Sequence, residues 1–296
     1  MNLQRLSIAL IGVVVWLWAA SASAQVTATS GLHSNIEYGQ AGGEKLLLDA
    51  NVPPGATGFP VVIVVHGGGW SSGDKSNEVA PVLAPLTAAN FTWFSIDYRL
   101  APKNHWPACY EDVQTAIRWV KAHAVEYKGD PARIGLIGYS AGGELVCLAA
   151  ARAGEDTRVQ AVVGLAPPTD IPADVARRGG LLTKSLQDLF GHMPAVDPAT
   201  LQLMQDMSAI SHLHPGLPPF LLIHGTADQS VTYSQSVNFQ AKLKENKVPC
   251  ELITVKGAPH KITDWDKFDP GWEEKMVAWL KQVLGGQKTP ADGNSD

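Results

Sequence analysis

The sequence lacks the cysteines that would hold a small disulfide-linked fold together. Its 296 residues include only three, Cys109, Cys147 and Cys250, which are too few and too widely spread for a disulfide scaffold. Because the number is odd, at most one intramolecular disulfide can form. Free cysteine packs like a small hydrophobic residue, so we expect buried thiols. Cys109 and Cys147 can still pair if the two predicted helices that carry them are neighbours.

Positive charge is also sparse. The chain has 23 lysine and arginine residues against 28 aspartate and glutamate residues, a net charge of −5 at pH 7. No basic stripe runs along it. This balance argues against nucleic acid or an anionic membrane as a partner, because both are bound through clustered positive charge.

Motifs that would bind a metal or a nucleotide are missing as well. His212 and His214 form only an isolated His-x-His pair, and no group of His, Cys, Asp and Glu residues has the spacing of a metal site. We therefore expect neither a metal nor any other cofactor.

The chain has a single long apolar run, at its N-terminus. Arg5 precedes the apolar residues 8–20, and Ala22-Ser23-Ala24 then supplies small residues at the two positions that a signal peptidase recognises. We predict a signal peptide over residues 1–24. The alternative, an uncleaved anchor helix, is disfavoured because the run is shorter than the ~20 residues that span a bilayer. The mature protein is thus expected to be secreted, to the periplasm or the medium, without membrane attachment.

Beyond the leader, short apolar runs alternate with helical patterns. Several runs are apolar on both faces, as strands of a helix-covered parallel sheet are. The predicted strands are Leu46–Ala50, Val61–Val65, Phe91–Ile96, Ile134–Ile137, Val159–Leu165, Phe220–His224 and Glu251–Val255. Strand and helix in alternation predict an α/β fold with an open, mostly parallel sheet.

Helical stripes fill the intervals between these strands. Apolar residues at helical spacing mark Tyr110–His123 and the last helix from Trp272 to Val283, and Tyr233, Val237 and Ala241 predict another buried stripe. The proline-rich segment 167–219, in which 181–190 and 199–207 have short helical patterns, interrupts the alternation, and we expect it to be an insertion over the carboxyl edge of the sheet. One domain is predicted over residues 25–285, followed by a disordered polar tail, 286–296.

The sharpest chemical signal is the run Gly138-Tyr139-Ser140-Ala141-Gly142. It follows a predicted strand and opens a predicted helix over 143–151, which is the context of a nucleophile elbow, a tight turn that pushes a serine hydroxyl out above the sheet. Glycine is needed on both sides because the turn leaves no room for side chains. The alternative is a serine in a glycine-rich turn that only packs the helix against the strand.

A serine hydroxyl needs a base to take its proton, and in this arrangement an acid and then a histidine follow the serine along the chain. His260 lies in a Gly/Pro turn just past a predicted strand, and Asp228 follows the strand before it. We predict Ser140, Asp228 and His260 as the catalytic residues, with Asp170 as the second candidate for the acid. His66 and His224 are expected to tether loops through their ring nitrogens.

The stretch from Val61 to Lys75 ends a β-branched strand in His-Gly-Gly-Gly-Trp. A carbonyl oxygen that becomes negative during attack needs preorganised donors, and backbone N–H groups on a side-chain-free loop supply them. We predict an oxyanion hole from Gly68, Gly69 and Ala141. Trp70 and Tyr139 are candidate substrate-binding residues, although Trp70 also fits a place in the core.

Taken together, HGGGW at 66–70, DYRLAP at 97–102, GYSAGG at 138–143, HGTAD at 224–228 and the late His260 resemble the α/β-hydrolase superfamily. The pattern is similar to the esterase and lipase group related to hormone-sensitive lipase, and within it to bacterial feruloyl and acetyl-xylan esterases, which share HGGGW followed by a Gly-Asp-Lys such as 73–75. The resemblance runs over residues 44–284. It implies an α/β-hydrolase fold, a serine ester hydrolase activity, and a structural role for Asp97 and Arg99 in tying loops.

One departure from the resembled group concerns the lid. Relatives of hormone-sensitive lipase often carry a long N-terminal helical cap, whereas the first predicted strand here closely follows the leader. Any lid must therefore come from the insertion at 167–219.

The leading hypothesis is a secreted serine esterase that removes acetyl or feruloyl groups from plant cell-wall polysaccharide such as xylan. Its partner would be a small ester or an esterified polysaccharide, a substrate class that rests on the resemblance alone. Three alternatives remain: a general short-chain carboxylesterase, a peptidase or an amidase such as a kynurenine formamidase, and a non-catalytic binding module on a hydrolase fold. The sequence gives no oligomeric state.

Overall fold

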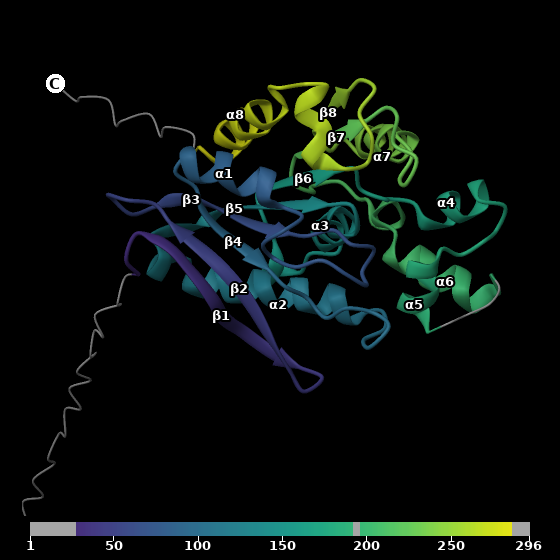
Figure 1. Cartoon of the computed structure of the whole chain (residues 1–296), viewed down its shortest axis with the longest axis horizontal. Helices are drawn as coiled ribbons and strands as arrows, with labels where there is room; N and C mark the ends of the chain where they lie inside the picture. Colours follow the sequence, from purple (N-terminus) through teal and green to yellow (C-terminus); the bar gives the residue numbers. More distant parts are fainter. Residues whose placement is uncertain (1–27, 192–195, 286–296) are drawn as a thin grey trace, which may run out of the picture.

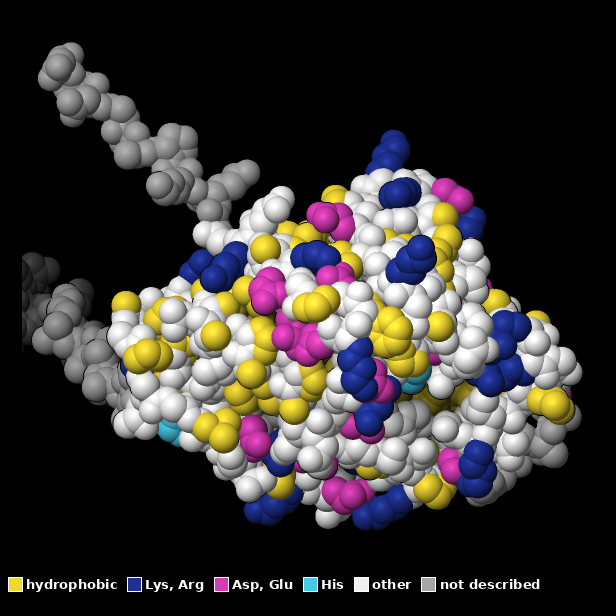
Figure 2. Space-filling model, turned by 45° about the horizontal axis from the view of Figure 1, so that its top comes forward, with side chains coloured by type: hydrophobic (Ala, Val, Ile, Leu, Met, Phe, Trp, Pro, Cys, Tyr) yellow, Lys and Arg dark blue, Asp and Glu magenta, His cyan; other side chains and the backbone are white. Residues whose placement is uncertain are grey.

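The computed structural model describes residues 28–191 and 196–285. The predicted signal peptide and the predicted disordered tail lie outside the described residues. No helix in the described part is long and apolar enough to cross a membrane. On the face drawn in Figure 2, acidic and basic side chains are interspersed rather than gathered by sign.

The described residues form an eight-stranded sheet in the order β1-β2-β4-β3-β5-β6-β7-β8. From β4 to β8 all neighbours pair in parallel, whereas β1 with β2 and β2 with β4 are antiparallel. The predicted mostly parallel sheet is thereby confirmed. The strands are β1 (Gly31–Ala41), β2 (Glu44–Val52), β3 (Phe59–Val65), β4 (Thr92–Ile96), β5 (Gly129–Tyr139), β6 (Ala161–Leu165), β7 (Phe220–Gly225) and β8 (Cys250–Val255).

Helices cover both faces of the sheet, and they divide the core in two (Figure 1). Alternate residues of β3 point to opposite faces: Val61, Ile63 and Val65 join the core under α2, α3 and α7, whereas Val62 and Val64 join the core under α1 and α8. These helices are α1 (Ala80–Ala88), α2 (Ala108–His123), α3 (Ala141–Ala151), α7 (Ser234–Glu245) and α8 (Trp272–Leu284).

Strand β1 was not predicted. It is an edge strand with mostly exposed side chains, so it carries no apolar run that periodicity could detect. Ala41 pairs with Glu44 across the turn Gly42-Gly43, and both glycines have positive φ, +57° and +78°. Two consecutive residues with positive φ form the turn that favours a two-residue hairpin, so this Gly-Gly pair was the available signal.

The predicted buried stripe on α7 is wrong. Val237 is 40% exposed, and the residues that α7 buries are Gln235, Ser236, Phe239 and Leu243. The buried face begins with polar residues because they hold neighbouring segments. The Gln235 side chain accepts hydrogen bonds from the backbone N–H groups of Thr169 and Asp170, and Ser236 bonds to His224.

The segment 167–219 joins β6 to β7, two strands that are neighbours in the sheet. It contains α4 (Ile171–Arg177), α5 (Lys184–Phe190), α6 (Pro198–Met207) and a 3-10 turn, Ala209–His212. Figure 1 shows the three helices gathered beyond one end of the sheet, where the parallel strands finish. The helical stretches expected at 181–190 and 199–207 are present as α5 and α6, while α4 was not predicted.

The motif at 97–102 ties the loops that follow β3 and β4. Asp97 accepts a hydrogen bond from the backbone N–H of Lys75 at 2.8 Å, and the Lys75 ammonium lies 3.4 Å from the same carboxylate. Arg99 forms a two-pronged ion pair with Asp112 of α2, whose side chain is buried. The expected structural role of Asp97 and Arg99 agrees with these contacts.

All three cysteines are free. Cys109 and Cys147 are buried and Cys250 is partly exposed. The possible Cys109–Cys147 disulfide is therefore not formed, and both thiols pack within the core under α2 and α3.

Candidate active site

Ser140 stands at the turn between β5 and α3, in a strained backbone conformation. Its φ is +53° and its ψ is −117°, a combination that costs a non-glycine residue on the order of 1–3 kcal/mol. A Cβ added at Gly138 would lie 2.1 Å from the Gly142 carbonyl oxygen. The two glycines thus allow the chain to double back closely enough to present the serine, as the predicted elbow requires.

The structure brings Ser140, His260 and Asp228 together. The His260 ring lies with Nε2 2.9 Å from the Ser140 hydroxyl and Nδ1 2.6 Å from a carboxylate oxygen of Asp228. The three residues follow β5, β8 and β7, and carboxyl ends of parallel strands meet at one edge of a sheet. Because a carboxylate only accepts, His260 carries its hydrogen on Nδ1 and leaves Nε2 free to accept from the serine hydroxyl.

Asp228 is buried and fully hydrogen-bonded. One oxygen accepts from the backbone N–H groups of Ser230 and Val231, and the other accepts from His260 and from His224 at 3.2 Å. Burial by itself would raise the pKa of this carboxyl, but the hydrogen bonds from the two rings outweigh burial and hold the pKa well below its usual range. The carboxylate is therefore ionised where it accepts the hydrogen bond from His260.

His224 fixes the acid from behind. Its Nε2 bonds the Val231 carbonyl oxygen at 3.0 Å as well as Asp228, and its Nδ1 bonds Ser236 of α7. A backbone carbonyl and a carboxylate only accept, so His224 carries a hydrogen on Nε2. The predicted tethering role of His224 agrees with these contacts, but the group it tethers is the carboxylate of Asp228 itself.

The Gly-rich loop after β3 lies beside the elbow. A Cβ added at Gly142 would come within 2.3 Å of the carbonyl oxygens of Val65 and His66, so the elbow and the end of β3 touch backbone to backbone. Gly68 and Gly69 both have positive φ, +105° and +57°, and a Cβ at Gly68 would lie 2.1 Å from Ser72 O.

Of the three predicted oxyanion donors, Gly69 and Ala141 line the same cavity as Ser140 and His260. Among the described residues neither of their backbone N–H groups has a hydrogen-bond acceptor. Gly68 does not line the cavity; its carbonyl accepts from Ser71 and Ser72 and closes the turn that carries Gly69.

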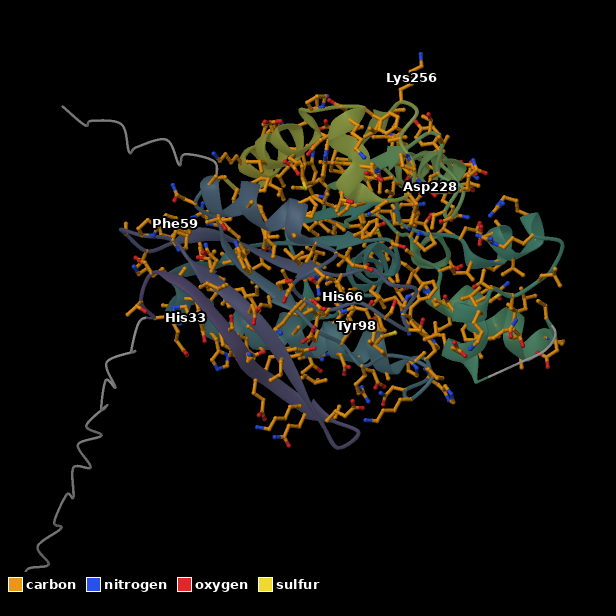
Figure 3. All side chains as sticks on the ribbon, in the orientation of Figure 1. His33, Phe59, His66, Tyr98, Asp228 and Lys256 are labelled. Carbon is orange, nitrogen blue, oxygen red and sulfur yellow. The ribbon has the colours of Figure 1, made fainter. Side chains whose placement is uncertain are left out.

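A second layer holds this loop in place. The Tyr98 ring stacks on His66 at 4.2 Å, and its hydroxyl donates to the His66 carbonyl (Figure 3). The Ala101 N–H donates to the Trp70 carbonyl at 2.9 Å. The residues at 98–101 therefore support the loop that carries the predicted oxyanion donors.

Trp70 lies both in the core and at the cavity. The residue is 6% exposed and packs in the core, and it is also among the residues that line the cavity. The indole N–H donates at 3.0 Å to Glu144, a fully buried carboxyl one turn after Ser140 in α3. The other oxygen of Glu144 has no partner among the described residues, and burial raises the pKa of this carboxyl well above its usual range.

Tyr139 has a different position from the one predicted. It is not among the residues that line the cavity. Its ring lies 5.3 Å from the His260 ring, and its hydroxyl donates to the His260 carbonyl at 3.1 Å. Its side chain thus packs against the histidine loop and contacts His260.

Asp170, the second candidate for the acid, lies away from His260. It caps α4 by accepting from the Ala173 N–H. Sequence reasoning missed Glu144 and named no substrate-binding residue within the insertion. For Glu144 the signal was an acid four residues after the nucleophile, inside an apolar helix.

A cavity of about 290 Å³ opens above Ser140. Its apolar lining includes Ile171 and Leu186 of the insertion together with Trp70 and Val231. Polar groups of the insertion, among them Asp174, Arg178 and Ser185, complete the wall.

A strained serine, a histidine and a buried carboxylate at the carboxyl edge of a mostly parallel sheet are the arrangement of the α/β-hydrolase fold. A solved carbohydrate esterase from gut microbiota superposes with a TM-score of 0.76 at 24% identity, covering 89% of this chain and 99% of that one. An acetyl ester-xyloside bifunctional hydrolase from Caldicellulosiruptor lactoaceticus gives a TM-score of 0.73 at 23% identity, covering 87% and 98%. At these identities the likeness shows the α/β-hydrolase fold.

Sequence comparison gives the family. The BD-FAE family model matches residues 48–243, and the chain belongs to this family. It is 34% identical to the esterase LipC of Mycobacterium tuberculosis over 242 residues, covering 76% of this chain and 58% of that protein. It is 33% identical to the esterase LipQ of the same organism, covering 72% and 52%. The chain thus spans just over half the length of these curated relatives.

Glu144→Gln should become more stable relative to wild type as the pH rises. Since the pKa of Glu144 is raised in the folded protein, the wild type gains stability from the bound proton at low pH. It loses that advantage as the pH rises above the ordinary value of about 4.3, whereas Gln does not titrate. The free energy of unfolding of both proteins in urea at pH 4, 6 and 8 measures the difference. A constant difference would contradict a neutral Glu144.

Asp228→Asn should show the opposite pH dependence. The lowered pKa of Asp228 stabilises the folded wild type above the ordinary value of about 3.9, and this contribution, on the order of 2 kcal/mol, disappears as the pH falls below it. The stability advantage of wild type over Asp228→Asn should therefore shrink from pH 6 to pH 3. Urea unfolding over the range where both proteins stay folded tests it; an advantage unchanged at pH 3 would refute it.

Proposed function

We propose that the protein is a carboxylic ester hydrolase whose nucleophile, base and acid are Ser140, His260 and Asp228. The observation that carries the proposal is the continuous hydrogen-bond chain from the Ser140 hydroxyl through both ring nitrogens of His260 to the buried Asp228. Membership of the BD-FAE family and the likeness to proteins named as esterases support it.

The geometry gives each group a step. Ser140 attacks the ester carbonyl while Nε2 of His260 accepts the hydroxyl proton, and Asp228 stabilises the charged ring. The negative oxygen is bound by the N–H groups of Gly69 and Ala141. His260 then donates the proton to the departing alcohol, leaving an acyl group on Ser140. Water, deprotonated by the same ring, attacks the acyl-enzyme and releases the acid.

The proposed natural substrate is an acetyl or feruloyl ester on plant cell-wall polysaccharide such as xylan. Two solved structures with the same fold are titled as a carbohydrate esterase and an acetyl ester-xyloside bifunctional hydrolase. The small cavity beside Ser140 and its polar wall fit a short acyl group on a hydroxyl-rich alcohol. A general short-chain carboxylesterase and an amidase use the same catalytic groups, and substrate tests separate them.

Ser140→Ala should abolish hydrolysis. Removing the nucleophile of such a triad costs on the order of 10⁶ in kcat, with the melting temperature little changed because alanine keeps the Cβ and the same backbone conformation. p-Nitrophenyl acetate, methyl ferulate, acetylated xylan and an N-formyl amide form the panel. Asp228→Asn should also be strongly impaired, whereas Asp170→Asn, which can still cap α4, should match wild type.

Each result in the panel decides one part of the proposal. Release of acetate or ferulate by wild type and not by Ser140→Ala supports the polysaccharide esterase. Cleavage of p-nitrophenyl acetate alone leaves a general carboxylesterase, and faster cleavage of the amide leaves an amidase. No cleavage of any substrate would leave the binding-module alternative.

We further propose that the protein is secreted through its first 24 residues, which carry the signal-peptide pattern. The full-length chain expressed in a Gram-negative host should be recovered from the periplasm or medium with Gln25 as its first residue, as read by N-terminal sequencing. Recovery of an intact, membrane-bound chain beginning at Met1 would instead indicate an anchor.

A further inference from the structure

One face of α4 and its C-terminal cap contributes two charged side chains to the cavity wall. Ile171, Asp174 and Arg178 line the cavity. They are three and four residues apart, so they lie one above another on the same side of the helix and its C-terminal cap. Arg177, between them in sequence, does not line the cavity.

Arg178 connects the insertion to the loop that holds the proposed catalytic acid. Its Nε donates to Asp174 at 2.9 Å, and its Nη2 donates to the Ser230 carbonyl at 2.6 Å. The Ser230 N–H in turn donates to Asp228 at 2.8 Å. Arg178 therefore lies on the side of the cavity where the Asp228 loop and His260 meet.

This placement puts Arg178 near the alcohol half of an ester. His260 must deliver a proton to the departing alcohol, so that half of the substrate lies toward His260 and its supporting loop. The acyl half lies toward the N–H groups of Gly69 and Ala141, beside the edge of Trp70.

The Arg178 guanidinium has N–H donors that can still bind a substrate. Among the described residues nothing accepts from Nη1 of Arg178, and the side chain is 29% exposed. Asp174, which is 12% exposed, accepts from Arg177 as well as from Arg178. Donors and a carboxylate thus lie side by side, which suits hydroxyl groups, since a hydroxyl both donates and accepts. An anionic group at this place would be repelled by the Asp174 carboxylate. An alkyl group would displace water from the guanidinium without replacing its hydrogen bonds, which costs free energy.

We propose that Arg178 is a specificity-determining residue that hydrogen-bonds hydroxyl groups on the alcohol half of the ester, so that sugar esters are preferred over alkyl esters of the same acid. This inference rests on the proposed esterase function and assigns its substrate selectivity to the insertion rather than to the catalytic groups.

The test compares esters that share their acid and differ in their alcohol. Methyl xyloside monoacetate and cyclohexyl acetate present rings of similar size, with and without hydroxyl groups. Hydrogen bonds to a charged group contribute enough that Arg178→Ala should lower kcat/KM for the xyloside ester by about tenfold or more, with a change under about threefold for cyclohexyl acetate. Arg177→Ala is the matched control, because it removes a neighbouring guanidinium from the same carboxylate and should alter neither value.

The outcomes separate this inference from the proposed function. Equal losses on both esters would mean that Arg178 only tethers α4 to the Asp228 loop, which overturns the inference while the esterase stands. A larger loss on acetoxyacetate, which carries a carboxylate on its alcohol half, would overturn hydroxyl recognition in favour of an anion. If wild type, checked against Ser140→Ala, cleaves none of these acetates, the proposed function fails and the inference fails with it.

Discussion

The site depends on places where backbone touches backbone without a side chain between. Gly142 of the elbow packs on the carbonyl oxygens at the end of β3, and Gly225 at the end of β7 packs equally closely on Ala258, where a Cβ would lie 2.2 Å from the carbonyl oxygen. The first contact sets the distance between Ser140 and the Gly-rich loop, and the second sets the Asp228 loop against the His260 loop. Any larger residue would push these strand ends apart.

Two sets of hydrogen bonds, one around Asp228 and one around Glu144, then hold the neighbouring side chains in place on this backbone. Both oxygens of Asp228 accept hydrogen bonds, which keep it ionised, while Glu144 is fully buried with one oxygen unpartnered within the part of the chain that the structure describes, and burial favours its neutral form. The charged acid orients the His260 ring, and the neutral acid orients Trp70 beside the oxyanion loop. The surroundings of each carboxyl, rather than its residue type, thus decide its charge: Asp228 is ionised and Glu144 is neutral.

Much of the frame was predictable because its signals are local. The elbow, the Gly-rich loop and the strands with apolar side chains on both faces each lie within a short stretch, and chain order led to Asp228 and His260. The errors have a different cause. Strand β1 is an exposed edge, α7 turns Gln235 and Ser236 inward to hold other segments, and Tyr139 points away from the cavity beneath the histidine loop. The α7 and Tyr139 errors depend on contacts between segments far apart in sequence, whereas β1 pairs with its neighbour β2 across Gly42-Gly43 and was missed because the exposed strand has no apolar run.

The insertion joins β6 to β7, which are already neighbours in the sheet. Its ends are therefore held at a fixed separation by strand pairing, whatever lies between them. A segment with such anchored ends can change in length and composition without altering strand register or the catalytic groups. Related chains could thus diversify their substrates by exchanging this one stretch, and a graft of residues 167–219 onto another member of the family would be a natural route to transfer selectivity between them.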